Sequence, residues 1–342
     1  TVGSQLFGDH VAERDAEIVS RLRAAGAVII GKTNMHELAF GATSANETFG
    51  AVANPWDAGK IPGGSSGGSG VAIAADLCIA SIGTDTGGAI RLPAAFTGVA
   101  GLRPTYGAVS TRGVFPVAHS LDTVGPLARS VLDVASVFAV IAGYDIRDPW
   151  SVDLPSPPVD VMPDVSGLRI GLPQPFFFDA LDPEVERAVR VAATVLCDLG
   201  ANVSELELQG GAEAAEACGV LIKVEALALH ERDLRERSDL FEEGTRRRLA
   251  LAEGLGATDL VRLIERATEW RAAVRRAFHG LDLMLTPTTP GPAPATGEVV
   301  TTTAAVVPFT HAIGLAHTPA LSLPCGFTGD GLPLGVQLVA AP

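Results

Sequence analysis

Hydrophobic residues recur at helical spacing in two segments that each lead into an apolar run. In residues 15–25 the positions Ile18, Leu22 and Ala25 share one helix face, and Gly26 ends the pattern before the apolar run 27–30. Near the middle of the chain, Asp182 begins a second predicted helix, residues 183–199, which ends at a glycine before the strand-like run 201–208. A helix followed by a buried strand is typical of α/β proteins.

The remaining pattern continues this alternation. It predicts a short helix at 71–75, a long helical stretch at 225–279, and strands at 78–82, 168–172 and 281–285. The tail, 320–339, predicts strands with turns at 324–326 and 329–331. We therefore expect a single α/β domain built on a large mixed, mostly parallel β-sheet with helices on both faces. The segment 145–164, rich in proline and aspartate, predicts a connection over the surface.

Composition narrows the range of functions. Of the 342 residues, 47% are hydrophobic and 19% charged, which predicts a packed core. The formal net charge of -14 argues against general binding to nucleic acid or to an anionic membrane. The apolar run 71–82 is too short for a membrane span and contains Asp76. The four cysteines lack zinc-site spacing and suggest reduced residues of a cytoplasmic protein.

The candidate chemistry lies in two segments rich in glycine, PGGSSGGSG at 62–70 and GTDTGGAIR at 83–91. Glycine lets backbone N–H groups approach a ligand closely, and such an array suits a phosphate or a developing oxyanion. A flexible linker is one alternative, but the first segment opens directly into an apolar helical run. A phosphate-binding loop would need a lysine that is absent here. A nucleophile elbow, GxSxG centred on Ser65 or Ser66, would need a preceding strand.

Together the two segments resemble the signature of the amidase-signature family. Further strings match that family: AAGAVIIGKTN at 24–34, NPW at 54–56, GLRPTYG at 101–107 and SLDTVGP at 120–126. The resemblance extends to 319–326 and 331–339, so it covers nearly the whole chain. It implies a Ser–Ser–Lys triad, in which a serine preceded by a cis peptide bond bridges a lysine and the attacking serine.

By motif position, the bridging serine corresponds to Ser65, with Ser66 as the alternative if the register shifts by one residue. The oxyanion hole corresponds to the N–H groups of Thr86, Gly87, Gly88 and residue 89 itself. Asp85 and Arg91 are interpreted as braces of this loop.

The sequence departs from the family pattern at two places. Ala89 occupies the position of the nucleophile and has no hydroxyl group, so no acyl-enzyme forms there. The resemblance places the catalytic lysine before Thr1, outside this chain, and neither Lys32 nor Lys60 suits the role. We interpret residues 1–342 as one amidase-signature domain from which both ends of the family's domain are missing. The intact glycines and Ser65 favour an engineered Ser→Ala change over a natural pseudoenzyme.

The resemblance also suggests that Phe40, Gly41 and Ala42 contact the substrate. His36 is interpreted as a polar loop residue, and residues 176–178, three phenylalanines, either belong to the core or reach a substrate tunnel. No metal-ligand pattern and no cofactor motif is present, so we expect neither a metal nor a cofactor.

These observations predict an amidase that hydrolyses a small carboxamide through an acyl-serine and that is inactive in this alanine form. The alternatives are a glutaminase-type subunit of an amidotransferase and a non-catalytic pseudoamidase. The expected partners are a small-molecule amide and a second copy of the chain in a homodimer, and neither nucleic acid nor a membrane. The expected location is the cytoplasm.

Overall fold

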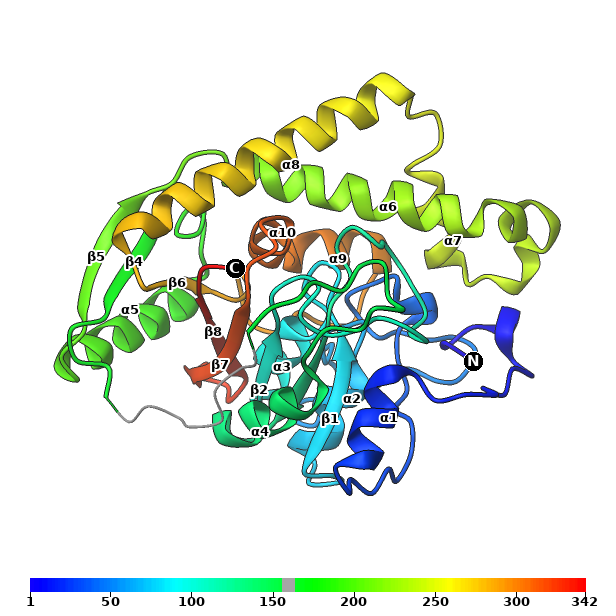
Figure 1. The fold of residues 1–342 in the computed structure, drawn as a ribbon, viewed down its shortest axis with the longest axis horizontal. Coiled ribbons are helices and arrows are strands. Elements are labelled where there is room, and N and C mark those ends of the chain that lie inside the picture. The colour runs from blue at the N-terminus through cyan, green and yellow to red at the C-terminus, as the bar shows by residue number, and fades with distance from the viewer. Residues whose placement is uncertain (156–163) are drawn as a thin grey trace.

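The computed structural model describes residues 1–155 and 164–342, and a single mixed sheet forms its centre (Figure 1). The strand order is β1-β3-β2-β7-β8-β6-β4-β5. The strands are β1 (Ala80–Thr84), β2 (Ala100–Arg103), β3 (Val124–Ala128), β4 (Arg169–Gln174), β5 (Asn202–Glu207), β6 (Leu283–Pro287), β7 (Ala320–Phe327) and β8 (Pro333–Val339). The expected α/β fold with one mixed sheet is confirmed.

The expectation of a mostly parallel sheet is wrong. Five of the seven strand pairings are antiparallel, and only β4–β5 and β4–β6 are parallel. Parallel neighbours need a long crossover, usually helical, whereas antiparallel neighbours can be joined by a turn or loop. Helix α5 (Pro183–Asp198) supplies such a crossover between β4 and β5. By contrast, β7 and β8 are joined by the predicted turn at 329–331.

Helices cover both faces of the sheet, as expected. Alternate residues of β3 face opposite layers, so Leu127 packs with α2 (Gly67–Ala74) and α3 (Arg91–Thr97), while Ala128 packs with α4 (Val131–Ile141). Helix α5 lies on the α4 side of the sheet, against Leu334 and Val336 of β8. The α2 and α3 side is the one that carries the glycine-rich segments.

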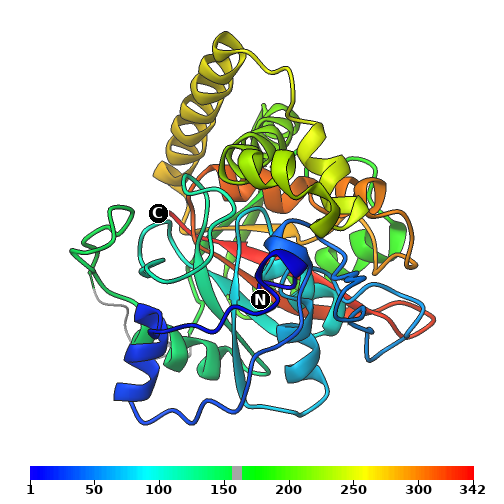
Figure 2. The same cartoon turned by 90° about the vertical axis from the view of Figure 1, so that its right-hand side faces the viewer.

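Long helices cross the molecule above the sheet (Figures 1 and 2). The predicted helical stretch 225–279 is divided among α6 (Gly211–Glu236), α7 (Glu243–Ala250) and α8 (Ala257–Ala277), because Ser238, Gly254 and Gly256 occupy the breaks between them. The remaining helices are α1 (Glu17–Ala24), α9 (Val299–Val306) and α10 (Pro308–Leu315). The short 3₁₀ turns are Gln5–Phe7, Glu37–Ala39, Ser238–Leu240 and Phe278–Gly280.

Local signals placed several boundaries correctly. Asp182 accepts a hydrogen bond from the N–H of Glu184 at the start of α5, as its predicted capping role requires. Helix α1 ends before Gly26, which has a φ of 87°. The predicted turn at 324–326 is instead a bulge within β7. The surface connection predicted at 145–164 lies partly outside the described residues.

The predicted strand at 27–30 is not formed. Val28 is 85% exposed and Ile30 74% exposed, and this segment pairs with no strand among the described residues. A strand needs a partner for its backbone groups, which an apolar pattern alone does not provide.

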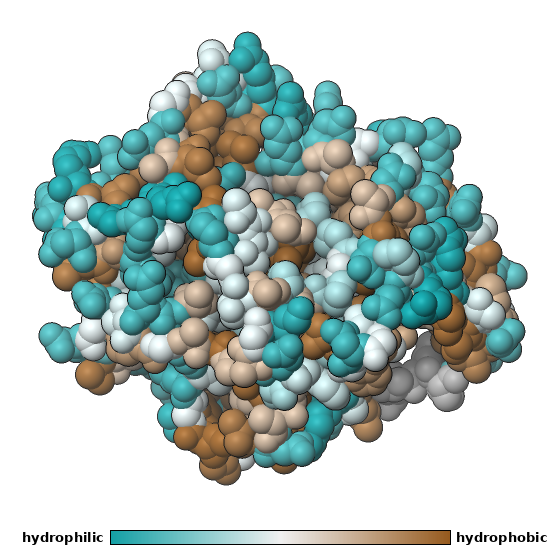
Figure 3. All heavy atoms as spheres, turned by 180° about the vertical axis from the view of Figure 1, so that it is seen from behind, coloured by the Kyte–Doolittle hydropathy of each residue, from teal (hydrophilic) through white to brown (hydrophobic). Residues whose placement is uncertain are grey.

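The rear face of the molecule is mostly hydrophilic, with separate apolar patches (Figure 3). None of the helices in the described ranges is both long and apolar enough to cross a membrane.

Candidate active site

The first glycine-rich segment forms the entry to α2. The peptide bond between Gly64 and Ser65 is cis, at the position that the resemblance implies. The side chain of Ser65 is fully buried, and its Oγ has no hydrogen-bond partner among the described residues. Its carbonyl oxygen accepts hydrogen bonds from the N–H of His36 and the Oγ of Ser44. Ser65 therefore has a fixed backbone and a hydroxyl that is free to engage another group.

Ser66 is held differently. Its Oγ donates to the carbonyl of Thr84 and accepts from the N–H of the same residue, both at 3.3 Å. Its backbone N–H donates to the carbonyl of Ala89 at 3.3 Å. Ser66 thus joins α2 to the second glycine-rich segment, and its hydroxyl is already occupied. Of the two serines, only Ser65 has a hydroxyl without a partner among the described residues, while Ser66 contacts the chain segment of Ala89.

Residues 85–90 of the second glycine-rich segment are folded around a buried carboxylate. Asp85 accepts hydrogen bonds from the N–H groups of Gly88 at 2.7 Å and Ile90 at 3.3 Å. It also forms ion pairs with Arg91 at 2.9 Å and Arg103 at 3.2 Å, and all three side chains are fully buried. Burial by itself raises the pKa of Asp85, but the two guanidinium groups hold it well below its usual range. The predicted bracing role of Asp85 and Arg91 fits this geometry.

This network alters the predicted set of oxyanion donors. The N–H of Gly88 is directed at Asp85, so it is not available to a substrate oxygen. The N–H groups of Thr86, Gly87 and Ala89 make no hydrogen bond to any described residue. Thr86, Gly87 and Ala89 also line a cavity together with Phe40, whereas Gly88 does not. The sequence pattern could not separate Gly88 from its neighbours, because only the position of Asp85 distinguishes them.

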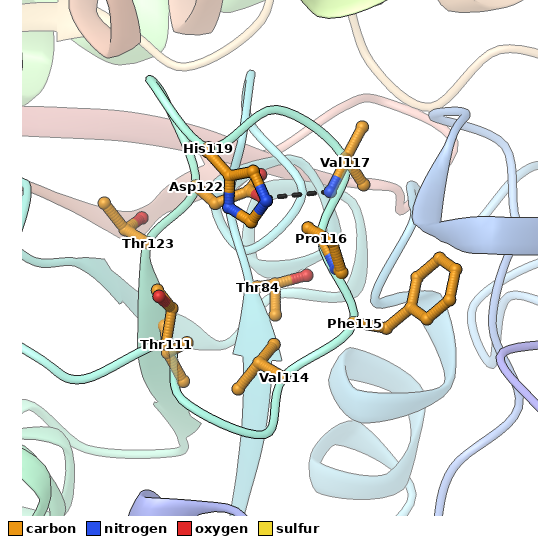
Figure 4. A pocket seen from close by; sticks show the side chains of 10 residues that line it. Thr84, Thr111, Val114, Phe115, Pro116, Val117, His119, Asp122 and Thr123 are labelled. Carbon is orange, nitrogen blue, oxygen red and sulfur yellow. Dashed lines mark hydrogen bonds between the residues drawn. The ribbon is translucent and has the colours of Figure 1, made fainter. Parts of the chain in front are cut away.

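The loop is also held from the side of β3. The Oγ of Thr86 donates to Asp122 at 2.5 Å, and Asp122 accepts the N–H of Val117 at 2.9 Å. Burial raises the pKa of Asp122 above its usual value, although these hydrogen bonds oppose the rise. Figure 4 shows Asp122 and His119 beside a second hollow of about 320 Å³, lined by Thr84 and residues 114–117 among others. Val117 is the one lining residue that this hollow shares with the cavity of Thr86, Gly87 and Ala89.

The cavity lined by Phe40 and Ala89, with about 360 Å³ of empty space, brings the predicted residues together. Its lining contains all three predicted substrate contacts as well as the loop residues that offer free N–H groups. It also contains residues from α3, α6, α7, α9 and α10 that sequence analysis did not select. The lining consists of Ala39, Phe40, Gly41, Ala42, Gly64, Thr86, Gly87, Ala89, Leu92, Val117, Ile222, Arg248, Thr303, Val307 and His311.

Arg248 is the charged residue in this lining. Its side chain, from α7, is buried, its Nε has no hydrogen-bond partner, and it forms no ion pair with a described residue. Its guanidinium carbon lies 4.5 Å from the centre of the Phe40 ring. Burial lowers the pKa of Arg248 to about 10, so the group is still charged at neutral pH. In the sequence Arg248 belongs to an Arg-Arg-Arg run. Such a run predicts a solvent-exposed helix face, so the pattern gives no indication that Arg248 is buried.

His36 is buried beneath the cavity wall, which corrects its interpretation as a polar loop residue. It is 1% exposed, and its ring lies against Gly41, where a Cβ atom would come within 2.1 Å of Nε2. Its Nδ1 lies 3.3 Å from the Oγ1 of Thr43. A side chain at position 41 would displace this ring, so glycine is required there for packing.

Acid is expected to destabilise the fold through His36. Burial lowers the pKa of this ring to about 3, with a further contribution from Arg248. The unfolded chain, with a histidine pKa of about 6.5, takes up the proton first as the pH falls. The resulting stability is complete above pH 6.5 and declines towards pH 3, with a loss of about 2 kcal/mol at pH 5. Because burial also lowers the pKa values of His311 and His317, the share of His36 is the part of the loss between pH 7.5 and pH 5, measured by urea unfolding, that a His36 variant removes.

The matched variants are His36→Gln and, on the surface, His10→Gln. The first is expected to reduce the difference in unfolding free energy between the two pH values, and the second to leave it unchanged. An equal pH dependence in all three proteins would show that His36 is not responsible.

Other candidates lie away from the cavity. Phe177 is fully buried, and Phe176 and Phe177 both pack against Phe309, so these aromatics belong to the core. Neither Lys32 nor Lys60 lines the cavity. Within the described ranges, no group of His, Cys, Asp or Glu side chains is arranged to hold a metal ion.

Comparison with known proteins identifies the family of this chain. The family model named Amidase matches residues 1–342. The A subunit of the glutamyl-tRNA(Gln) amidotransferase of Symbiobacterium thermophilum is 41% identical over 371 residues, covering 100% of this chain and 76% of that protein.

Solved structures give the same result. A chain from a vestigial protein complex that reveals the evolutionary origins of an s-triazine catabolic enzyme has a TM-score of 0.92 at 38% identity, covering 100% of this chain and 76% of that one. The A subunit of the glutamyl-tRNA(Gln) amidotransferase of Thermotoga maritima has a TM-score of 0.88 at 30% identity, covering 99% and 75%. The chain belongs to the amidase family.

Proposed function

We propose that this chain binds a small carboxamide that carries a carboxylate group, and that a serine at position 89 would hydrolyse it through an acyl-enzyme. The observation that supports this substrate class is Arg248, a buried cation without an acidic partner in the same cavity as the free N–H groups. A buried unpaired charge is costly, and a ligand carboxylate would neutralise it with directed hydrogen bonds.

The cavity lining combines two kinds of chemistry, N–H donors of the loop and one buried guanidinium group. The N–H groups of Gly87 and Ala89 would stabilise the oxyanion that develops on the amide carbonyl. Arg248 would hold the carboxylate at the other end of a short acyl chain. Ser65 would relay the proton of a serine at position 89, and alanine at that position leaves binding without turnover.

A glutaminase-type subunit of an amidotransferase is the second candidate. It is favoured by relatives whose names give them as the A subunit of glutamyl-tRNA(Gln) amidotransferase, which are about 40% identical over the whole chain. In that role the carboxamide would be glutamine, and other subunits would receive the ammonia. The homodimer, the cytoplasmic location and the engineered origin of Ala89 stay predictions.

Arg248→Gln tests the proposed substrate class. The chain with Ala89, called the alanine chain below, is expected not to hydrolyse its ligand. Calorimetry can therefore measure the affinity of this chain for glutaramate, a five-carbon monoamide with one carboxylate. A hydrogen-bonded charge contributes about 1.5–3 kcal/mol, so the variant is expected to bind between about tenfold and a hundredfold more weakly.

Arg247→Gln is the matched control, since Arg247 is the neighbouring residue but is exposed and paired with Glu298 at 3.1 Å. It is expected to leave the affinity for glutaramate unchanged. Equal affinity of the Arg248→Gln chain and its parent would refute the carboxylate site.

A further inference from the structure

The tautomer of His311 is set by its backbone contact. This residue lies on α10, and its Nδ1 is 3.3 Å from the carbonyl oxygen of Ala215 on α6. A carbonyl oxygen only accepts hydrogen bonds, so Nδ1 carries the proton and Nε2 presents a lone pair. His311 therefore provides an acceptor at Nε2.

This acceptor lies beside the loop that offers N–H donors. A Cβ atom added to Gly87 would lie 2.6 Å from Cδ2 and 2.7 Å from Nε2 of His311, so this ring edge packs directly against the loop. Nε2 makes no hydrogen bond to any residue in the described ranges, and His311 lines the cavity. The part of the lining around Gly87 thus combines N–H donors with an unused acceptor.

The charges around His311 are cationic. Burial lowers the pKa of His311 to about 3, and Arg248, Lys223 and Arg91 lower it further, while the contact with Ala215 raises it. The ring is therefore neutral at neutral pH. None of the described residues that line the cavity is aspartate or glutamate. In this cavity a ligand ammonium group would meet the guanidinium group of Arg248 and no carboxylate of a lining residue.

We propose that His311 determines substrate specificity: its Nε2 accepts a hydrogen bond from an un-ionised N–H of the ligand, and the cavity selects carboxylate-bearing amides that lack an ammonium group. The inference rests on the proposed function and narrows its substrate class to monoamides of dicarboxylic acids and related ureido acids. Free glutamine, which carries an ammonium group, is disfavoured.

The pairing follows from the chemistry of a carboxamide. Its oxygen accepts hydrogen bonds and its NH₂ group donates them, so it matches both the loop N–H groups and Nε2 of His311. A methyl ester of the same acid has a similar size but no N–H, and it would leave Nε2 unpaired. Sites that hydrogen-bond a ligand group discriminate against analogues without it, because their own polar atom is then left unpaired.

Calorimetry on the alanine chain with three ligands tests the proposal. The ligands are glutaramate, its monomethyl ester analogue monomethyl glutarate, and L-glutamine. We expect glutaramate to bind about fivefold to tenfold more tightly than the ester, because one neutral hydrogen bond is lost in the ester. We expect glutamine to bind at least tenfold more weakly than glutaramate, since its ammonium group finds no carboxylate.

Two variants isolate Nε2. An Asn side chain can reach the position of Nδ1 and keep the bond to Ala215, so His311→Asn removes the acceptor alone and should abolish the difference between amide and ester. A Gln side chain can place its oxygen near the position of Nε2, so His311→Gln should retain part of that difference. Thermal unfolding of both variants verifies that each is folded, and the Gln variant keeps the test valid if the Asn variant is not.

The outcomes are distinct. If His311→Asn weakens amide and ester binding equally, the residue has only a structural role and the proposal fails. Glutamine binding as tightly as glutaramate would refute the exclusion of ammonium. If both results occur while Arg248→Gln still weakens glutaramate, only this inference is lost. Binding of all three ligands that does not depend on Arg248 would overturn the proposed function as well.

Discussion

An Ala89→Ser variant is expected to hydrolyse small carboxamides at least a thousandfold faster than the alanine chain. Loss of a catalytic serine typically reduces turnover by on the order of a millionfold, so its restoration has a correspondingly large effect. The new hydroxyl would lie beside Ser66, whose N–H binds the carbonyl of Ala89, and beside the free N–H groups of the loop. The resemblance assigns the base to a lysine before Thr1, so the assay uses a chain that carries such a segment. Ammonia release from glutaramate measures the rate.

Two further variants separate the nucleophile from other effects. Ala89→Gly changes the same position without adding a hydroxyl and is expected to stay inactive. Ala89→Ser combined with Ser65→Ala is expected to lose most of the gained activity, because the relay is removed. Full activity in that double variant would exclude Ser65 as the relay, and no activity from Ala89→Ser on any amide would favour a pseudoamidase.

Replacement of Asp85 by alanine is expected to have the largest effect on stability. The change leaves Arg91 and Arg103 as two fully buried cations without their carboxylate. Breaking a buried ion pair by removal of one partner costs about 3–5 kcal/mol, a large part of the total stability of most domains. The midpoint of urea unfolding at pH 7.5 should fall accordingly, or the chain should fail to accumulate as a folded protein.

The site is expected to change along with stability. Arg91 donates to the carbonyl of Thr310 at 2.9 Å, and the Oγ of Thr310 donates to Gly87 at 2.7 Å. Asp85 therefore positions both the donor loop and α10, which carries His311. Any folded Asp85→Ala protein should bind glutaramate more weakly than its parent.

Asp282→Ala provides the matched control for Asp85→Ala. Asp282 pairs with Arg169 at 2.9 Å on the surface, where both side chains are partly exposed to solvent. Exposed ion pairs contribute little to stability, so the unfolding midpoint should barely change. Similar losses in the two variants would contradict the central role of the Asp85 network.

Local sequence signals identified the two glycine-rich segments, 62–70 and 83–91, that form the loop of residues 85–90 and its support. The strings around Ser65 and Ala89 are continuous in the chain, and their glycines have direct steric reasons, so a pattern could find them. At Gly68, for example, a Cβ atom would lie 2.2 Å from the carbonyl oxygen of Asn34. Phe40, Gly41 and Ala42 were found by the family resemblance, and all three line the cavity.

The other side of the cavity was not predictable from local pattern. Arg248 belongs to a basic run on α7, and His311 has no carboxylate at metal or triad spacing. What distinguishes them is burial against segments far away in sequence, since His311 packs against Gly87 and Arg248 lies over the ring of Phe40. Similarly, the N–H of Gly88 is withdrawn from the site by Asp85 only because Arg91 and Arg103 hold that carboxylate in place.

By itself the sequence determined the α/β class, the helix caps, the position of the loop of residues 85–90 and the absence of a hydroxyl group at residue 89. These properties depend on residue type and short-range spacing, which the chain carries locally. The tertiary structure alone decided the antiparallel majority of the sheet, the set of free N–H donors, and the presence of Arg248 and His311 in one cavity. Those properties depend on which distant segments exclude water from each other, because burial is what leaves one cation without a partner and one imidazole neutral.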